Sequence, residues 1–294
     1  MFRFLKTHII NLYNNFALKN LIIRATTGLF FIALILGAIV YKSYSFMALF
    51  TLITFLSLFE FYQLIRGKEN IFSNIFDSLG GAILFMALFS SMGGNLFFSP
   101  ATAFSLYFVY ILILFISRIY SKRELLKSWG YAILGQAYIA LPFSLLNVIA
   151  FQPDFTGRQI YSSVMLLAFF IFIWANDTGA YLIGTWIGKH KLYPRISPKK
   201  SWEGFWGGIF FSLIAAFLFG HFYSQLFSYI EWMGLALTIS IFGTWGDLCE
   251  SAIKRQLDIK DSGGMFPGHG GMLDRFDSTF IAAPAAMIYL TLIF

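Results

Sequence analysis

The sequence has few charged residues and a single cysteine. Lys, Arg, Asp and Glu make up 12% of the 294 residues and hydrophobic residues make up 58%, whereas about a quarter of the residues of a soluble domain are charged. So small a polar fraction cannot cover a water-soluble globule, and the excess apolar surface must face lipid. Cys249 is the only cysteine, which excludes an intramolecular disulfide and a metal site built on paired cysteines. A metal ion would have to be held by oxygen atoms or by the four histidines.

Apolar segments of spanning length follow one another along the chain, and a helix needs about 20 residues to cross a bilayer. The nine segments are roughly 25–41, 44–65, 78–98, 101–119, 131–150, 161–187, 204–222, 230–253 and 278–294. Helices are expected because backbone groups cannot stay unpaired in lipid, and the two-residue alternation of a β-barrel is not evident. We therefore predict an all-α polytopic integral membrane protein with about nine transmembrane helices.

The basic residues predict the organisation and orientation of these helices. Residues 1–24 mix basic with apolar and aromatic positions, which indicates an amphipathic segment in the membrane interface. We interpret 25–294 as one transmembrane domain with its catalytic part in 161–294. With the N-terminus in the cytoplasm, 19 of the 21 Lys and Arg residues fall in cytoplasmic stretches, as the positive-inside rule requires. The net charge of +7 is then a topology signal, and no nucleic-acid partner is expected.

Acidic residues within apolar segments are unusual, because a charge at the centre of a membrane helix costs about 2.5–3.5 kcal/mol on insertion scales. Four acidic residues have such positions: Glu60, Asp177, Asp247 and Glu250. Asp247 and Glu250 are three residues apart and are predicted to share a helix face; they belong either to a binding site or to an intramembrane polar network. Glu60 is flanked by aromatic residues and lies near Arg66, which favours a structural or interfacial role.

The stretch 260–277, KDSGGMFPGHGGMLDRFD, combines glycines, basic residues and aspartates. Glycines let backbone N–H groups approach an anion closely. Mg²⁺ prefers a few carboxylates together with substrate phosphates. The composition therefore predicts a phosphate and Mg²⁺ site at the membrane surface, and the alternative is a plain glycine-rich connection. His269 within it is either an ordinary loop histidine or a group for substrate phosphate or acid–base chemistry.

A second polar stretch, 197–204, reads SPKKSWEG. Adjacent lysines beside serines suit a polyphosphate or a lipid phosphate, although a simple positive-inside anchor explains them as well. The polar patch 176–181 lies in an otherwise apolar segment. It either lines the same cavity or joins helices to one another.

Several of these motifs together resemble the signature of the phosphatidate cytidylyltransferases, also called CDP-diacylglycerol synthases. They are SAIKR at 251–255, KD at 260–261 and HGGMLDRFD at 269–277, with the intervening spacing retained. Residues 176–184, 197–204 and 246–248 are also similar to this family. The resemblance covers about the last 120 residues, whereas the preceding part matches only as a set of hydrophobic spans.

The resemblance implies a Mg²⁺-dependent transfer of CMP from CTP to phosphatidic acid, which yields CDP-diacylglycerol and pyrophosphate. The presence of a second cation is left open. The implied metal ligands are Asp247 and Asp274, with Asp277, Asp177 and Glu250 as weaker candidates. The residues expected to act in catalysis are Asp247, Asp274, Lys254, Arg255, Lys260, His269 and Arg275. The residues expected to bind substrate are Ser197, Lys199, Lys200, Ser201, Ser251, Gly270 and Gly271.

Three other interpretations compete with this one. A related CTP-using membrane enzyme, such as a polyprenol-type kinase or an ether-lipid cytidylyltransferase, would differ in its lipid pocket. A cation- or proton-coupled transporter would use Asp177, Asp247 and Glu250 as a pathway and would need matched features in both halves of the chain, and a scaffold gives no reason for the 260–277 motif. The expected partners are CTP, phosphatidic acid and the lipid bilayer, with a homodimer as the expected assembly and a bacterial cell (inner) membrane as the location.

Overall fold

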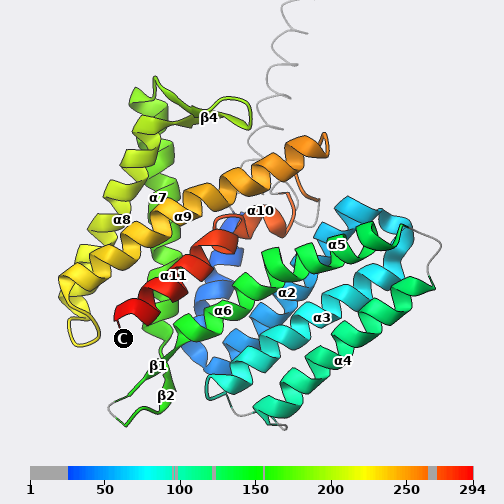
Figure 1. Ribbon diagram of the computed structural model, residues 1–294. Coiled ribbons are helices and arrows are strands. Elements are labelled where there is room, and N and C mark those ends of the chain that lie inside the picture. The colour runs from blue at the N-terminus through cyan, green and yellow to red at the C-terminus, as the bar shows by residue number, and fades with distance from the viewer. Residues whose placement is uncertain are drawn as a thin grey trace, which may run out of the picture.

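The computed structural model describes residues 26–94, 96, 99–120, 124–154, 156–263 and 270–293, and most of these residues are helical (Figure 1). The helices are Thr26–Tyr41, α2 (Ser43–Arg66), η1 (Lys68–Asn70), α3 (Ile71–Ser91), α4 (Pro100–Ile119), α5 (Leu125–Gly135), η2 (Gln136–Ala140), α6 (Leu141–Ala150), α7 (Ser163–Ile187), α8 (Trp202–Phe222), α9 (Tyr229–Gln256), α10 (Leu273–Phe276) and α11 (Thr279–Ile293). Two short antiparallel hairpins lie between helices: β1 (Phe151–Pro153) with β2 (Gln159–Tyr161), and β3 (Lys191–Tyr193) with β4 (Ser197–Ser201). The predicted all-α membrane fold is confirmed, with these hairpins added in the connections.

Within the described residues, seven helical segments are long and apolar enough to cross a membrane. They are Ser43–Arg66, Lys68–Ser91, Pro100–Ile119, Leu125–Ala150, Ser163–Ile187, Trp202–Phe222 and Leu273–Ile293. The two other predicted segments are helical as well, but Thr26–Tyr41 is shorter and α9 carries several charged residues in its last turns. The count of nine spans and the orientation therefore remain predictions.

Helices α7 and α8 lie side by side because glycines line their contact (Figure 1). A Cβ atom at Gly179 would lie 2.7 Å from the backbone oxygen of Gly207, and one at Gly204 would lie 2.8 Å from that of Ala180. Only glycine allows two helix backbones to approach so closely. This contact holds the β3–β4 hairpin, which connects α7 to α8, in a fixed place at one end of the pair.

Phe276 anchors the short helix α10 in the core. Its ring centroid lies 5.2 Å from that of Phe143 on α6, 6.2 Å from Phe50 on α2 and 6.4 Å from Phe170 on α7. All four rings are buried, with at most 2% of their surface exposed. Aromatic pairs at such distances add to the stability gained from burial. The polar residues on either side of Phe276 are therefore held by a rigid aromatic cluster.

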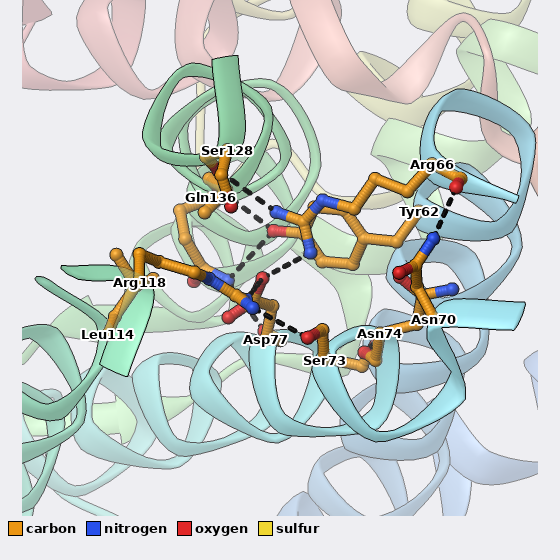
Figure 2. A network of polar contacts seen from close by, with 12 residues as sticks. Tyr62, Arg66, Asn70, Ser73, Asn74, Asp77, Leu114, Arg118, Ser128 and Gln136 are labelled. Carbon is orange, nitrogen blue, oxygen red and sulfur yellow. Dashed lines mark hydrogen bonds and ion pairs between the residues drawn. The ribbon is translucent and has the colours of Figure 1, made fainter. Parts of the chain in front are cut away.

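A buried ion cluster joins α2, α3 and α4 (Figure 2). The carboxylate of Asp77 is fully buried and lies 2.5 Å from Nη1 of Arg66 and 2.7 Å from Nη2 of Arg118. Arg118 also donates to Ser73 Oγ at 2.6 Å, and the side chain of Gln136 donates to the backbone oxygen of Asp77 at 2.7 Å. A charge in such a place requires paired counter-charges and hydrogen bonds. This set, centred on Asp77, is called the Asp77 cluster below.

The polar connections gather at one end of the molecule. The β3–β4 hairpin and the C-terminal end of α9 lie toward the same end, whereas the β1–β2 hairpin lies at the opposite end (Figure 1). Arg255 near the end of α9 donates to the backbone oxygen of Ile196 in the hairpin at 3.4 Å. The hairpin that carries residues 197–201 therefore contacts the end of the helix that precedes residues 260–277.

Candidate active site

Two cavities adjoin at the side chains of Asp177 on α7 and Asp247 on α9. The first has a volume of about 310 Å³ and lies between α7, α8, α9 and the β3–β4 hairpin. Lys199 and Lys200 line it, so we call it the lysine cavity. The second has a volume of about 280 Å³, and Asp274 and Asp277 complete its lining together with residues of helix Thr26–Tyr41. We call it the aspartate cavity; Asp177 and Asp247 line both.

The hairpin places Lys200 against Asp247 of α9. Nζ of Lys200 lies 2.5 Å from Oδ2 of Asp247, and both side chains are partly exposed, at 25% and 29%. Lys199 also lines the lysine cavity. The neighbouring Ser201 begins α8 as its N-cap, because its Oγ accepts a hydrogen bond from the N–H of Gly204 at 3.1 Å. Such a cap satisfies one of the free N–H groups at a helix start.

The aspartate cavity brings together residues that are far apart in the sequence. Asp177, Asp247, Asp274 and Asp277 all line it, as does the exposed Arg275. Asp274 and Asp277 both line this cavity, and α10 begins at Leu273. The arrangement creates a local excess of carboxylates, which favours a bound cation.

Lys254 binds two carboxylates, one of which, Asp274, lines this cavity. Its Nζ lies 2.5 Å from Oε2 of Glu250 and 2.8 Å from Oδ1 of Asp274. All three side chains are mostly buried, with Glu250 exposed by only 4%. Asp247 and Glu250, which were predicted to share a helix face, bind different lysines, Lys200 and Lys254. Among the described residues, the linings of both cavities include Asp247 but not Glu250, which points to Lys254 instead.

Ser251 belongs to the Asp247 side of this helix. Its Oγ donates to Oδ1 of Asp247 at 3.2 Å, one helical turn away. The hydroxyl group therefore touches a carboxylate that lines both cavities, and its predicted role in the site is compatible with its position.

Asp274 organises the turn that precedes it. Its Oδ2 accepts hydrogen bonds from the N–H groups of Gly271 at 2.8 Å and Ser262 at 3.0 Å. Gly270 has a φ of +82°, a left-handed conformation that disfavours residues with a Cβ atom. A Cβ atom on Gly270 would in addition run into Oδ2 of Asp274. The two predicted glycines, Gly270 and Gly271, thus surround the Asp274 carboxylate.

Three other predicted residues, Arg255, Ser197 and Lys260, are not among the described residues that line the two cavities. Arg255 is exposed and donates to the backbone oxygens of Ile196 and Ile259, at 3.4 and 3.1 Å. Ser197 begins strand β4 beside this contact, and Lys260 is exposed just beyond α9. His269 lies outside the described residues.

Two parts of the site were not predicted from the sequence. Helix Thr26–Tyr41 contributes Thr27, Gly28, Phe31 and Ile32 to the aspartate cavity, although nothing in its apolar sequence distinguishes it from the other spans. Glu60 on α2 contacts Ser262 and Met272 on either side of positions 264–269. A charged residue within an apolar span indicates a specific partner. The basic residue nearest to Glu60 in the sequence is Arg66, but Arg66 binds Asp77 instead.

The donor atoms fit a magnesium ion that is shared with substrate. Within the described ranges, three His, Cys, Asp or Glu side chains do not converge closely enough to hold a metal ion by themselves. Mg²⁺ is usually bound by one or two carboxylates, with substrate phosphates and water as its other ligands. Four aspartates around one cavity of about 280 Å³ meet that requirement.

The fold and this site define a polytopic membrane protein with a polar cavity pair near one end of its helix bundle. The cytidylyltransferase family pattern matches residues 22–293. The chain therefore belongs to the cytidylyltransferase family.

Curated relatives are similar over part of their length. The phosphatidate cytidylyltransferase of Staphylococcus aureus (strain COL) is 42% identical over 168 residues, and that of Bacillus subtilis (strain 168) is 40% identical over 163 residues. Each match covers 55% of this chain. The chain spans 64% of the length of the Staphylococcus protein and 58% of the Bacillus protein.

Proposed function

We propose that this protein is a membrane-embedded phosphatidate cytidylyltransferase, which transfers CMP from CTP to phosphatidic acid and releases pyrophosphate. Its membership of the cytidylyltransferase family and its similarity to proteins named phosphatidate cytidylyltransferase support this function. The motifs at 251–255 and 269–277 support it as well. Family membership favours this reaction over ion transport.

The observation that carries the proposal is the pair of cavities that share Asp177 and Asp247. A cytidylyl transfer needs cations for phosphate groups and carboxylates for a metal ion at the same point. The lysine cavity supplies Lys199 and Lys200, and the aspartate cavity supplies Asp274 and Asp277. Two phosphate-bearing substrates entering from different cavities would meet at the shared aspartates.

The reaction requires little covalent chemistry from the protein. A phosphate oxygen of phosphatidic acid attacks the α-phosphorus of CTP, a new P–O bond forms, and the bond to pyrophosphate breaks. Because the attacking oxygen is already ionised, a strong general base is not needed, and positioning with charge neutralisation accounts for catalysis. A bound Mg²⁺ would neutralise phosphate oxygens as negative charge builds up.

The basic residues are placed to serve the phosphates. Lys200 and Lys254 now neutralise Asp247 and Asp274 at 2.5 and 2.8 Å. On substrate binding, these ammonium groups are expected to donate to phosphate oxygens, which leaves the aspartates free to hold the metal ion. Arg275 lines the aspartate cavity and is assigned to the same task.

The proposed location follows from the substrates. CTP is dissolved in the cytosol and phosphatidic acid lies in the membrane leaflet, so the β3–β4 hairpin and the end of α9 are assigned to the cytoplasmic surface. The relatives are bacterial proteins, so a bacterial cell membrane is the proposed location, and a homodimer is the proposed assembly.

The test is a reconstituted assay with purified protein in lipid, CTP, phosphatidic acid and Mg²⁺. The expected result is CDP-diacylglycerol and pyrophosphate in equal amounts. In the control reactions each component is omitted in turn, and in a further control a metal chelator is added; none of these reactions is expected to form product. Replacing phosphatidic acid by a polyprenol or an ether-lipid phosphate tests the related CTP-using reactions. Folded protein that forms product only with one of these other lipids would refute the proposed substrate, and no nucleotide transfer at all would refute the proposed activity.

A further inference from the structure

The buried carboxylate of Glu60 connects α2 to the turn that carries Asp274. Glu60 is 7% exposed. Its Oε1 accepts a short hydrogen bond from Ser262 Oγ, and its Oε2 accepts one from the N–H of Met272 at 2.6 Å. These partners lie 202 and 212 residues along the chain from Glu60, so the contact is made only in the folded protein.

Two glycines make room for this carboxylate. A Cβ atom on Gly263 would lie 2.6 Å from Oε1 of Glu60. A Cβ atom on Gly271 would overlap both the Glu60 carboxylate and Ser262 Oγ. The glycines at 263 and 271 therefore serve the approach of Glu60 as well as the shape of the turn.

Glu60 and Asp274 hold the same two pieces of backbone. Asp274 accepts hydrogen bonds from the N–H groups of Ser262 and Gly271, and Glu60 binds the hydroxyl of Ser262 and the N–H of Met272. Asp274 in turn lies 2.8 Å from Nζ of Lys254. A displacement of either piece of backbone would thus move the carboxylate that lines the aspartate cavity and the lysine bound to it.

The partners of Glu60 are those of a residue that fixes backbone. A buried carboxylate is costly unless it is fully hydrogen-bonded, and the described partners of Glu60 are a hydroxyl and an amide rather than a basic side chain. Arg66, six residues later on the same helix, is bound to Asp77. The charge of Glu60 is thus directed to the turn and not to an ion pair within its own half of the chain.

We propose that Glu60 is a positioning residue for cytidylyl transfer, which holds Ser262 and Met272 so that Asp274 and Lys254 stand at the reacting phosphates. This inference rests on the proposed function. It assigns to α2, outside the signature motifs, a part in aligning the site.

The main variants are Glu60→Met and Glu60→Gln. Met has similar length but cannot accept these hydrogen bonds, so the turn loses both contacts. A misplacement of about 1 Å can lower a rate about 100-fold, and we expect kcat to fall about 30- to 100-fold in Glu60→Met with the KM for CTP changed less than about threefold. Gln can still accept from Met272, and it is expected to restore at least about a third of the wild-type kcat.

The control is Glu124→Gln. Glu124 is an exposed carboxylate at the start of α5, far in sequence from Glu60, and is paired with Lys127 of α5. It is expected to leave kcat, KM and thermal stability unchanged. Ser262→Ala removes only the hydroxyl partner, and it is expected to lower kcat about threefold to tenfold. In the double variant Glu60→Met with Ser262→Ala, the loss is expected to be no larger than in Glu60→Met alone. Independent, multiplicative losses would overturn the proposal.

Hydrogen exchange gives a readout that does not depend on activity. The amides of Ser262, Gly271 and Met272 are expected to exchange faster in Glu60→Met than in the wild type, whereas α3 and α4 stay unchanged. Unchanged exchange at these amides would overturn the positioning role. Wild-type protein without cytidylyl transfer would refute the proposed function, while exchange would still decide whether Glu60 holds the turn. If Glu60→Met does not fold, Ser262→Ala must show faster exchange at these amides, or the proposal fails.

Discussion

The Asp77 cluster and the aspartate cavity both place carboxylates among apolar helices, but they satisfy them differently. Asp77 has no exposed surface, and two arginines from neighbouring helices lie within 2.7 Å of it (Figure 2). In the aspartate cavity, four aspartates line an accessible space of about 280 Å³, and Asp247 is 29% exposed. The first arrangement leaves no room for a ligand, whereas the second is accessible and has an excess of negative charge.

The difference teaches how to separate structural from functional charges in a membrane protein. Intramembrane acidic residues are functional candidates by default, yet Asp77 is occupied by side chains of its own protein. The transporter interpretation required matched acidic features in both halves of the chain. The acidic residues within the α-helices of the N-terminal half are Asp77 and Glu60, and both are buried and bonded to groups of the protein itself. A matched acidic pathway is therefore not found among the described residues.

The largest expected effect is on stability, from Asp77→Asn. The substitution leaves the buried guanidinium groups of Arg66 and Arg118 without a carboxylate, which typically costs about 3–5 kcal/mol. Thermal unfolding of the purified protein in detergent measures the loss. The activity of the molecules that remain folded is expected to stay near that of the wild type.

The matched control for Asp77→Asn is Asp154→Asn, the same chemical change at a partly exposed turn residue of the β1–β2 hairpin. It is expected to have the smaller effect on stability. An Asp77→Asn protein with unchanged stability and no activity would contradict the structural role of the Asp77 cluster.

The next effect is on the rate, from Asp247→Asn. Removal of one group that stabilises charge in a transition state lowers kcat about 100- to 1,000-fold, and Asp247 lines both cavities. Stability should change little, because this side chain is partly exposed and paired with a partly exposed lysine. Formation of CDP-diacylglycerol with saturating substrates is the measurement, with Asp154→Asn again as control. If Asp247→Asn has the kcat of the wild type, the aspartate cavity is not the site of the reaction.

The sequence was sufficient to predict an all-α membrane fold, because long apolar segments indicate helices that cross a bilayer. The third span shows the limit. It was predicted at 78–98, whereas the helices run through Lys68–Ser91. The polar residues Ser73 and Asp77 resemble a loop in sequence, but both bind Arg118 of α4. That pairing depends on packing between helices and leaves no local pattern.

The part of the site that lies in the motifs shared with the family was predictable from the sequence. Asp247, Asp274 and Asp277 were expected together, and they line one cavity. Glu250 was a weaker candidate, and its side chain binds Lys254, which also binds Asp274. The contact of Glu60 with Met272 spans 212 residues and arises from the packing of α2 against α10, which local sequence does not specify.

A smaller effect is expected from Lys200→Met, which removes the cation that lies 2.5 Å from Asp247. A hydrogen bond to a charged group contributes about 1.5–3 kcal/mol, so kcat/KM for CTP should fall roughly 10- to 100-fold. Steady-state kinetics with varied CTP measure this change, and Lys127→Met, an exposed lysine paired with Glu124, is the control. An unchanged kcat/KM would mean that Lys200 does not bind CTP and acts only as a basic residue that orients the chain in the membrane.

The smallest expected effect is that of Ser201→Ala, at the boundary between the lysine cavity and the start of α8. The hydroxyl is mostly buried and accepts the N–H of Gly204 at 3.1 Å, and loss of such a cap costs about 0.5–2 kcal/mol. Thermal unfolding should therefore shift modestly, whereas kcat/KM for CTP should change less than about threefold. Ser201→Thr keeps the cap and should restore the stability. If Ser201→Ala instead lowers kcat/KM with no change in unfolding, the hydroxyl contacts substrate. The N-cap residue of α8 would then be a functional polar group and not only a structural one.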